Sequence, residues 1–266
     1  MRHLLIALFL TSLNALYSQC IDSNKAFKEG EIVRYSAYYN WNFIWVNAGE
    51  VTFSTKLIKH QEKPAYFLKA IGTTYKGYDF FYSVRDTFEA IVDTTHLEPL
   101  YYMQSSNEGR FNSHQYYWFN QLEKRVKTSV RMEKEPIVLK DSSFDNCASD
   151  VLSMVYKCRN MDFSKYHYNE KIPISLILDG KLEHLYVRYL GIEEVEDRQN
   201  RRFKCFKFSP YLPKNALFSG GEEMLVWVTT DKNRIPIVVE AKILIGSVKA
   251  IFLDVQNPRN PIETVK

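Results

Sequence analysis

The sequence predicts a mainly β protein, in which a curved antiparallel sheet is covered by one central helix near residues 148–160. Three observations predict this fold class. Aromatic residues make up 15% of the chain, with 18 Tyr and 17 Phe, and together with frequent Val, Ile and Thr they favour strands. Short segments with strand-like alternation recur along the chain, separated by turn residues. One segment carries apolar residues at convincing helical spacing.

The first nineteen residues have the layout of a secretory signal peptide. A basic start, Arg2–His3, precedes the apolar run Leu4–Leu16, and a small residue stands before the expected cleavage site. The apolar run is too short for a membrane span. We therefore expect export to the periplasm or the periphery of the outer membrane. Residues 1–19 would be the signal peptide and residues 20–266 a single β-rich domain.

Thirteen segments carry strand signals. In Glu50–Leu57, for example, Val51 and Phe53 alternate with polar residues, which is typical of a half-buried strand. The candidates are Glu31–Tyr39, Glu50–Leu57, Ala65–Thr73, Asp86–Asp93, Pro99–Ser105, Ser113–Asn120, Glu123–Met132, Lys171–Leu178, His184–Gly191, Arg202–Ser209, Met224–Thr230, Ile235–Ile243 and Ser247–Val255. Turn residues such as Asp179-Gly180 separate several of them. Gly246 is expected to have a positive φ, because a tight reversal there leaves little room for a side chain.

Short turns between successive strands favour antiparallel neighbours, so a meander is the expected topology. Roughly a dozen strands do not remain a flat open sheet. They should curl into a barrel or half-barrel, or fold into two packed sheets.

The central helix is predicted by an apolar face that includes Val151 and Val155 at helical spacing. Asp145 or Asn146 is the expected N-cap, since both side chains accept hydrogen bonds from the first turn. A second short helix is considered over Tyr75–Val84, where the aromatic residues suit an extended segment equally well.

The charge and the motifs argue against several functions. A net charge of +4 provides no electrostatic basis for nucleic-acid binding. The six histidines lack the spacing of metal ligands, and the chain contains no phosphate-binding glycine loop, dinucleotide motif or nucleophile elbow. We therefore expect no metal, no cofactor, no nucleic-acid partner and no catalytic residues. An uncharacterised hydrolase remains an alternative, because a catalytic triad assembles only in space.

Four cysteines, Cys20, Cys147, Cys158 and Cys205, allow disulfides in an exported protein. Cys147 and Cys158 bracket the predicted helix and should lie roughly 16 Å apart, beyond the about 7 Å that a disulfide spans. Any bond should therefore join one of these to Cys20 or Cys205, and buried free thiols are the alternative. A lipid anchor at Cys20 is disfavoured, because Gln19 rather than a small residue precedes it.

Aromatic side chains crowd three segments, around Tyr38–Trp45, Tyr78–Tyr82 and Tyr116–Phe119. They either build a large packed core or line a concave apolar pocket within the curved sheet. On the second interpretation, the ligand-binding candidates are Tyr39, Trp41, Phe43, Trp45, Phe81 and Trp227.

Several short motifs follow one another in a defined order. They are Phe27-x-x-Gly30-Glu31 with Tyr35, Ala48-Gly49-Glu50, Arg85-Asp86 with Glu89 and Asp93, Leu97-x-Pro99, Asp150-x-x-Ser153-x-x-Tyr156-x-x-Arg159, Trp227-x-x-x-Asp231 with Pro236, and Gly246-Ser247-Val248. Their order and spacing resemble the domain of unknown function 3108 family of exported bacterial proteins. The resemblance implies an exported, strand-rich protein without an assigned activity.

Charged residues within these motifs form a candidate structural polar network, made of Glu31, Arg85, Asp86, Glu89, Asp150 and Arg159. Asp150 and Arg159 lie at opposite ends of the predicted helix, where the helix dipole favours their charges. We expect the network to tie strand ends to the helix, with a clamp for a polar ligand as the alternative.

The function that we expect is non-enzymatic. An exported cell-envelope protein would hold an apolar or amphipathic, lipid-like ligand in its curved sheet. The alternative is a structural or assembly protein that docks on another envelope component through a sheet edge or face.

Overall fold

The computed structural model describes residues 20–21, 23–41, 44–79, 82–144, 147–214, 220–243 and 246–265, and the side chain of Trp41 is not among them. The predicted signal peptide therefore lies outside the described residues. So do the ligand-binding candidates Phe43 and Phe81.

Fourteen strands form one antiparallel sheet within the described residues. The first eight are β1 (Ile32–Trp41), β2 (Ile44–His60), β3 (Lys63–Thr74), β4 (Arg85–Asp93), β5 (Pro99–Glu108), β6 (Phe111–Asn120), β7 (Arg125–Met132) and β8 (Val138–Ser143). The other six are β9 (Lys171–Leu178), β10 (Lys181–Glu196), β11 (Arg202–Pro210), β12 (Met224–Thr229), β13 (Pro236–Lys242) and β14 (Ser247–Gln256). The mainly β prediction is confirmed.

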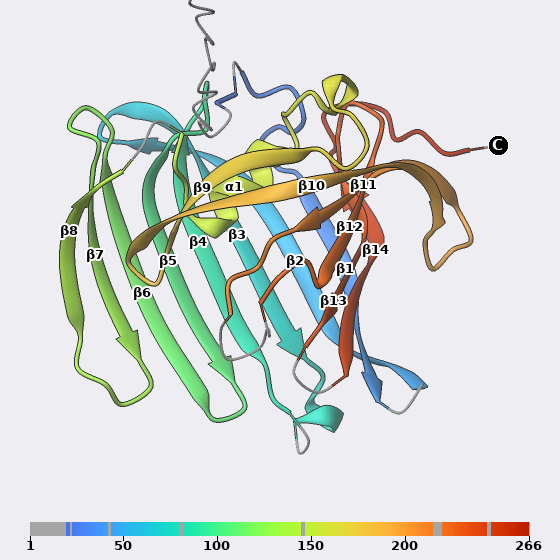
Figure 1. Ribbon diagram of the computed structural model, residues 1–266, viewed down its shortest axis with the longest axis horizontal. Coiled ribbons are helices and arrows are strands. Elements are labelled where there is room, and N and C mark those ends of the chain that lie inside the picture. Colours follow the sequence, from blue (N-terminus) through green and yellow to red (C-terminus); the bar gives the residue numbers. More distant parts are fainter. Residues whose placement is uncertain are drawn as a thin grey trace, which may run out of the picture.

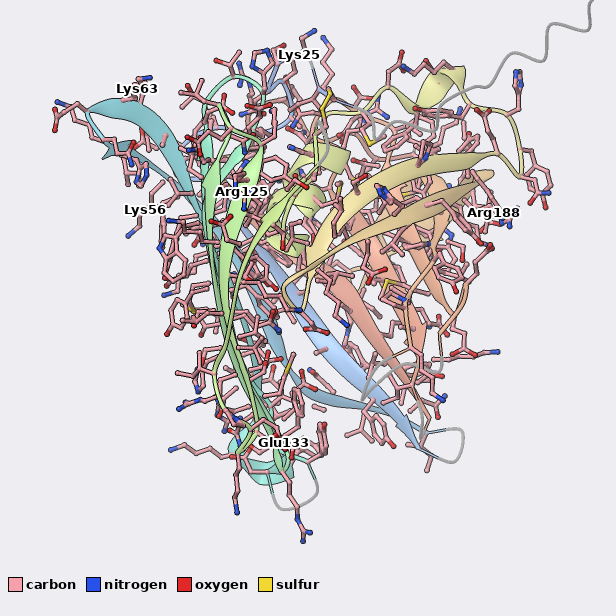
Figure 2. All side chains as sticks on the ribbon, turned by 60° about the vertical axis from the view of Figure 1, so that its left-hand side comes forward. Lys25, Lys56, Lys63, Arg125, Glu133 and Arg188 are labelled. Carbon is pink, nitrogen blue, oxygen red and sulfur yellow. A yellow bond between two sulfur atoms is a disulfide. The ribbon has the colours of Figure 1, made fainter. Side chains whose placement is uncertain are left out.

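The sheet consists of two meanders that the first and last strands join (Figure 1). Strands β1 to β8 are neighbours in chain order, as are β9 to β14, and β1 pairs with β14. The sheet does not close, and β8 and β9 form its two ends. Figure 2 shows the two halves inclined to each other with the helix between them. Bulges, including one between Arg34 and Tyr35 and one between Trp227 and Val228, increase the local twist and favour this curvature.

All thirteen predicted strands are present, and one further strand, β8, was not predicted. Its sequence VLKDSS is exposed or half-buried along its whole length, so it lacks the apolar alternation from which a strand is recognised. Pairing with β7 at the end of the sheet determines its conformation instead.

The central helix α1 (Val151–Cys158) is shorter than predicted, and its N-cap is Asp150. The predicted caps Asp145 and Asn146 lie outside the described residues. The Asp150 carboxylate accepts hydrogen bonds from the Ser153 backbone N–H at 2.8 Å and hydroxyl at 2.6 Å. The residue before the cap, Ser149, pairs with the end strand β9, which keeps the chain extended up to Asp150. The considered helix over 75–84 is reduced to one 3₁₀ turn, η1 (Lys76–Tyr78), among its described residues.

The largest apolar core packs α1 against the first half of the sheet and also takes in side chains of β9 to β12. It includes the fully buried residues Phe27, Leu68, Ala90 and Tyr156. The tip of the β9–β10 hairpin reaches across this core to β6. There the Gln115 amide donates to Asp179 at 2.9 Å, and the Gly180 N–H donates to the Tyr117 hydroxyl at 3.3 Å. These contacts hold the second half over the first.

Cys20 and Cys147 form a disulfide with 5.2 Å between their Cα atoms. The predicted absence of a Cys147–Cys158 bond is confirmed, since Cys158 and Cys205 are free thiols. The bond attaches the start of the described chain to the segment immediately before α1.

Two glycines lie where the backbone leaves no room for a side chain. Gly246 has a φ of +85°, as predicted, and a Cβ there would collide with the carbonyl oxygen of Asn40. In β2, a Cβ on Gly49 would collide with the carbonyl oxygen of Thr73 and lie 2.9 Å from the Cα of Thr74. Close approach of β2 and β3 therefore requires glycine at position 49.

We predict that Gly49→Ala lowers the free energy of unfolding by about 1–3 kcal/mol, because the added methyl forces the two strands apart. Gly72→Ala is the matched control. It lies in β3, where a Cβ meets nothing closer than 4.0 Å, and we expect a change of about 0.5 kcal/mol or less. Urea denaturation of both variants measures the difference. Equal effects of the two substitutions would contradict this account of β2–β3 packing.

Candidate functional site

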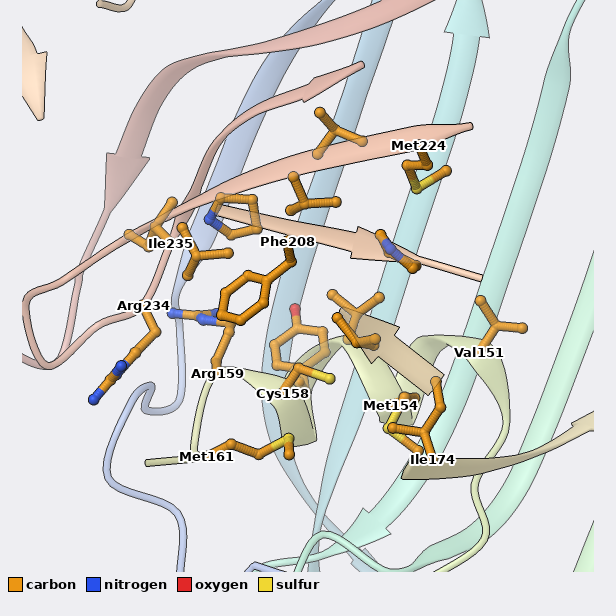
Figure 3. A pocket seen from close by; sticks show the side chains of 18 of the residues that line it. Val151, Met154, Cys158, Arg159, Met161, Ile174, Phe208, Met224, Arg234 and Ile235 are labelled. Atoms are coloured by element: carbon orange, nitrogen blue, oxygen red, sulfur yellow. The ribbon is translucent and has the colours of Figure 1, made fainter. Parts of the chain in front are cut away.

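A cavity of about 450 Å³ lies between α1 and the part of the sheet formed by β1, β2 and the second half (Figure 3). Almost all of its wall is apolar. The lining side chains on the helix and its neighbouring segment are Val151, Met154, Val155, Tyr156, Cys158, Arg159, Met161 and Phe163. Those on the sheet and its loops include Val33, Tyr35, Val51, Phe53, Ile172, Ile174, Leu176, Val187, Phe208, Pro210, Leu212, Met224, Val226, Val228, Arg234, Ile235, Pro236, Val239 and Ala250.

The spacing of these residues along the sequence explains why they line the same cavity. On α1, positions 151, 154, 155 and 158 line the cavity, and this i, i+3, i+4, i+7 spacing places them on one face of a helix. Leu152 belongs to the core against the first half instead. On β9 and β12 the lining residues alternate, at 172, 174 and 176 and at 224, 226 and 228, which is the strand period of two.

An ion pair between Glu31 and Arg159 anchors the helix beside the cavity. The Arg159 guanidinium donates to both Glu31 carboxylate oxygens, at 2.6 and 3.0 Å, and to the Asn233 carbonyl at 3.0 Å. The two side chains are 1% and 6% exposed. Burial alone would lower the pKa of Arg159, but the charge and hydrogen bonds of Glu31 outweigh it and raise the pKa. Arg159 therefore stays charged.

The cysteine and tyrosine side chains in the wall are held neutral. Burial raises the pKa of the Cys158 thiol to about 12 and that of the Tyr156 hydroxyl to about 12. Burial also raises the pKa of Tyr35. At neutral pH none of the three is a charged nucleophile or base.

The described aromatic candidates do not line this cavity. Trp227 lies between the lining residues Val226 and Val228 and faces the other side of β12. Its indole N–H donates to Glu193 at 2.9 Å. The Lys249 ammonium lies 4.5 Å from the ring centre of Trp45, and Tyr39 is half-buried on β1. Aliphatic and methionine side chains, rather than the clustered aromatic residues, build most of the wall.

The predicted polar network divides into separate interactions. Glu31 and Arg159 meet as described above, and Asp150 caps α1. Arg85 donates to Asp79 at 2.6 Å, and Lys69 donates to Glu89 at 2.8 Å. Asp86 accepts from the Asn107 backbone N–H at 3.0 Å. The helix end and the strand ends are thus stabilised locally rather than through one cluster.

Asp86 and Glu108 form a pair of carboxyl groups that share a hydrogen bond. Burial and the neighbouring Asp86 raise the pKa of Glu108 to about 7, and burial raises the pKa of Asp86. One proton held between the two groups relieves the repulsion of like charges.

Within the described residues, no helix combines the length and the apolar character that crossing a membrane requires. Across the same ranges, no three His, Cys, Asp or Glu side chains come together as a metal site would need.

The chain belongs to the DUF3108 family, described as a protein of unknown function, whose family model matches residues 34–252. No curated protein matches the chain. A similar fold occurs in the crystal structure of a β-barrel-like protein of the domain of unknown function DUF1849 from Brucella abortus. That structure is 8% identical, covers 87% of this chain and 99% of its own, and has a TM-score of 0.55. At this identity the likeness shows the fold alone.

We predict that Glu31→Gln lowers the free energy of unfolding by about 3–5 kcal/mol, because it leaves the buried Arg159 charge without its partner. Glu29→Gln, two residues away at an exposed position, is the control and should be nearly neutral. Combining Glu31→Gln with Arg159→Met should restore part of the loss. Chemical denaturation of the four proteins tests this. A full loss that persists in the double variant would contradict the ion-pair explanation.

We predict that Glu108→Gln stabilises the fold above neutral pH. The folded-state pKa of Glu108 is raised from 4.5 to about 7, so its contribution is complete below the unfolded pKa and is lost as the pH rises through 7. Glutamine does not ionise and avoids this loss. Melting temperatures near pH 8 should favour the variant by a few degrees, and the advantage should vanish near pH 4. An advantage that grows toward acid pH would have the wrong sign.

Proposed function

We propose that this member of the DUF3108 family is a non-enzymatic protein of the cell envelope that binds an apolar or amphipathic, lipid-like ligand. The observation that carries the proposal is the 450 Å³ cavity with its apolar wall. Its volume falls within the roughly 300–1,000 Å³ of typical ligand pockets. Apolar wall that faces water is unfavourable by roughly 25 cal/mol per Å², and a bound apolar chain would cover it.

Binding rather than catalysis is supported by the chemistry of the wall. Among the described lining residues, the Cys158 thiol and the Tyr156 hydroxyl are protonated at neutral pH, since burial raises both pKa values to about 12. Covalent catalysis needs a nucleophile that is activated by a base or a lowered pKa. Arg159 is fully engaged with Glu31 and the Asn233 carbonyl.

Export is supported by two features. The N-terminal residues have the pattern of a signal peptide, and the Cys20–Cys147 disulfide is the kind of bond that persists in oxidising compartments. The same bond supports a protein without a lipid anchor, because the sulfur of Cys20 is already in the disulfide. We therefore propose that the protein works in the periplasm or at the periphery of the outer membrane.

A second candidate function is docking on another envelope component. It is favoured by the convex face, where Tyr116 and Trp118 stack with 6.1 Å between ring centres. Trp118 is 48% exposed, and Leu139 on the end strand β8 is 74% exposed. Aromatic residues are enriched at protein interfaces, and an open strand edge can accept a partner strand. If docking is the function, the cavity holds no ligand.

We predict that native mass spectrometry after gentle extraction shows a lipid-sized adduct on the wild-type protein. Val226→Trp places an indole inside the cavity and should abolish both the adduct and the binding of the apolar probe phenylnaphthylamine. Leu139→Trp, on the exposed end strand, is the matched control and should retain both. A wild-type protein without adduct or probe binding would contradict the ligand-binding proposal and leave docking as the better candidate.

A further inference from the structure

Two arginine side chains lie at one end of the cavity, and the further inference concerns that end. Figure 3 shows Arg159 and Arg234 together at one end, opposite Val151 and Met224. Nearly all of the wall between them is apolar. An apolar space with charged residues at one end suits a ligand with one apolar chain and one polar head.

Arg234 has hydrogen-bonding capacity that the described residues do not use. It lies in the turn between β12 and β13, with its guanidinium over two rings, 5.4 Å from the centre of Phe163 and 4.9 Å from that of Phe206. Its Nη1 is buried without a hydrogen-bond partner in the described part of the chain. A buried charged donor left without a partner is costly, so a shift of the guanidinium that brings it to an acceptor would stabilise the site.

The nearest carboxylates have other partners. Asp162 accepts from the Ser164 backbone N–H at 3.1 Å and from its hydroxyl at 2.6 Å. Asp231 accepts from the Thr229 hydroxyl at 2.9 Å and from backbone N–H groups of its own turn. Both lend negative potential to Arg234, but neither forms an ion pair with it in the described residues. Arg159 differs, because Glu31 satisfies it fully.

We propose that the ligand is an anionic single-chain amphiphile whose head group binds Arg234 while its apolar chain runs along α1 toward Val151 and Met224. This inference rests on the proposed function and names its ligand class. The head carries a carboxylate or a phosphate, both of which the planar guanidinium can bind through two oxygens. Because Arg234 is half-buried and lies at one end of the cavity, the head binds at that end and the chain is buried in the apolar part.

The test compares three ligands of equal chain length, namely palmitate, hexadecyl phosphate and hexadecanol, each displacing phenylnaphthylamine from the cavity. We expect wild-type protein to bind the two anions at least about tenfold more tightly than the alcohol, the size of one hydrogen-bonded charge contact. Arg234→Met should remove this preference while retaining affinity for the alcohol. Arg234→Lys should keep part of the preference, and Arg110→Met, at an exposed turn, should keep all of it.

The outcomes separate this inference from the function on which it rests. Equal affinity of wild-type protein for all three ligands would overturn the role of Arg234 and leave the apolar binding function standing. Retention of the preference in Arg234→Met would overturn it as well. If none of the ligands displaces the probe, or the probe itself does not bind, the proposed function fails first. Inorganic phosphate alone should not displace the probe, because the chain supplies most of the affinity. Melting curves confirm that each variant is folded.

Discussion

The buried ion pair between Glu31 and Arg159 is the contact on which the arrangement of the molecule depends. It joins three segments that are remote in sequence: the start of β1, the end of α1 and, through the Asn233 carbonyl, the β12–β13 turn. Two charges removed from water in this way tolerate little displacement, because separation would leave each unpaired. The helix is therefore held at a fixed distance from the second half of the sheet, and the space beside it does not collapse.

The cavity exists because the helix is much shorter than the strands that it covers. The helix α1 has eight residues, about 12 Å of helix, whereas β2 has 17 residues, roughly 55 Å of strand. One short helix cannot cover the interior of such a sheet. The Leu152 side of α1 completes the core against the first half, and the opposite side, which includes Val151 and Met154, faces the remaining space.

Local patterns in the sequence predicted the local structure. Alternation and turn residues were sufficient for thirteen strands and for the positive φ of Gly246, whereas β8 takes its conformation from pairing with β7. The site was harder to predict, because the pairing of β1 with β14 brings its walls together from opposite ends of the chain. The helical spacing of positions 151, 154, 155 and 158 was visible and could have indicated an apolar wall. The density of aromatic residues predicted ligand-binding roles for Trp45 and Trp227 instead, but the rings of both have polar partners.

The methionines offer the most direct measurement of ligand position. Met154, Met161 and Met224 line the cavity, whereas Met103 and Met132 lie on β5 and β7. When methionine-labelled protein is titrated with palmitate, the methyl NMR signals of Met154, Met161 and Met224 should therefore shift together. The signals of Met103 and Met132 should stay in place. If saturating palmitate shifts the signals of Met103 or Met132 instead, or shifts no methionine signal, the ligand is not held between α1 and the second half of the sheet. That result would contradict the account.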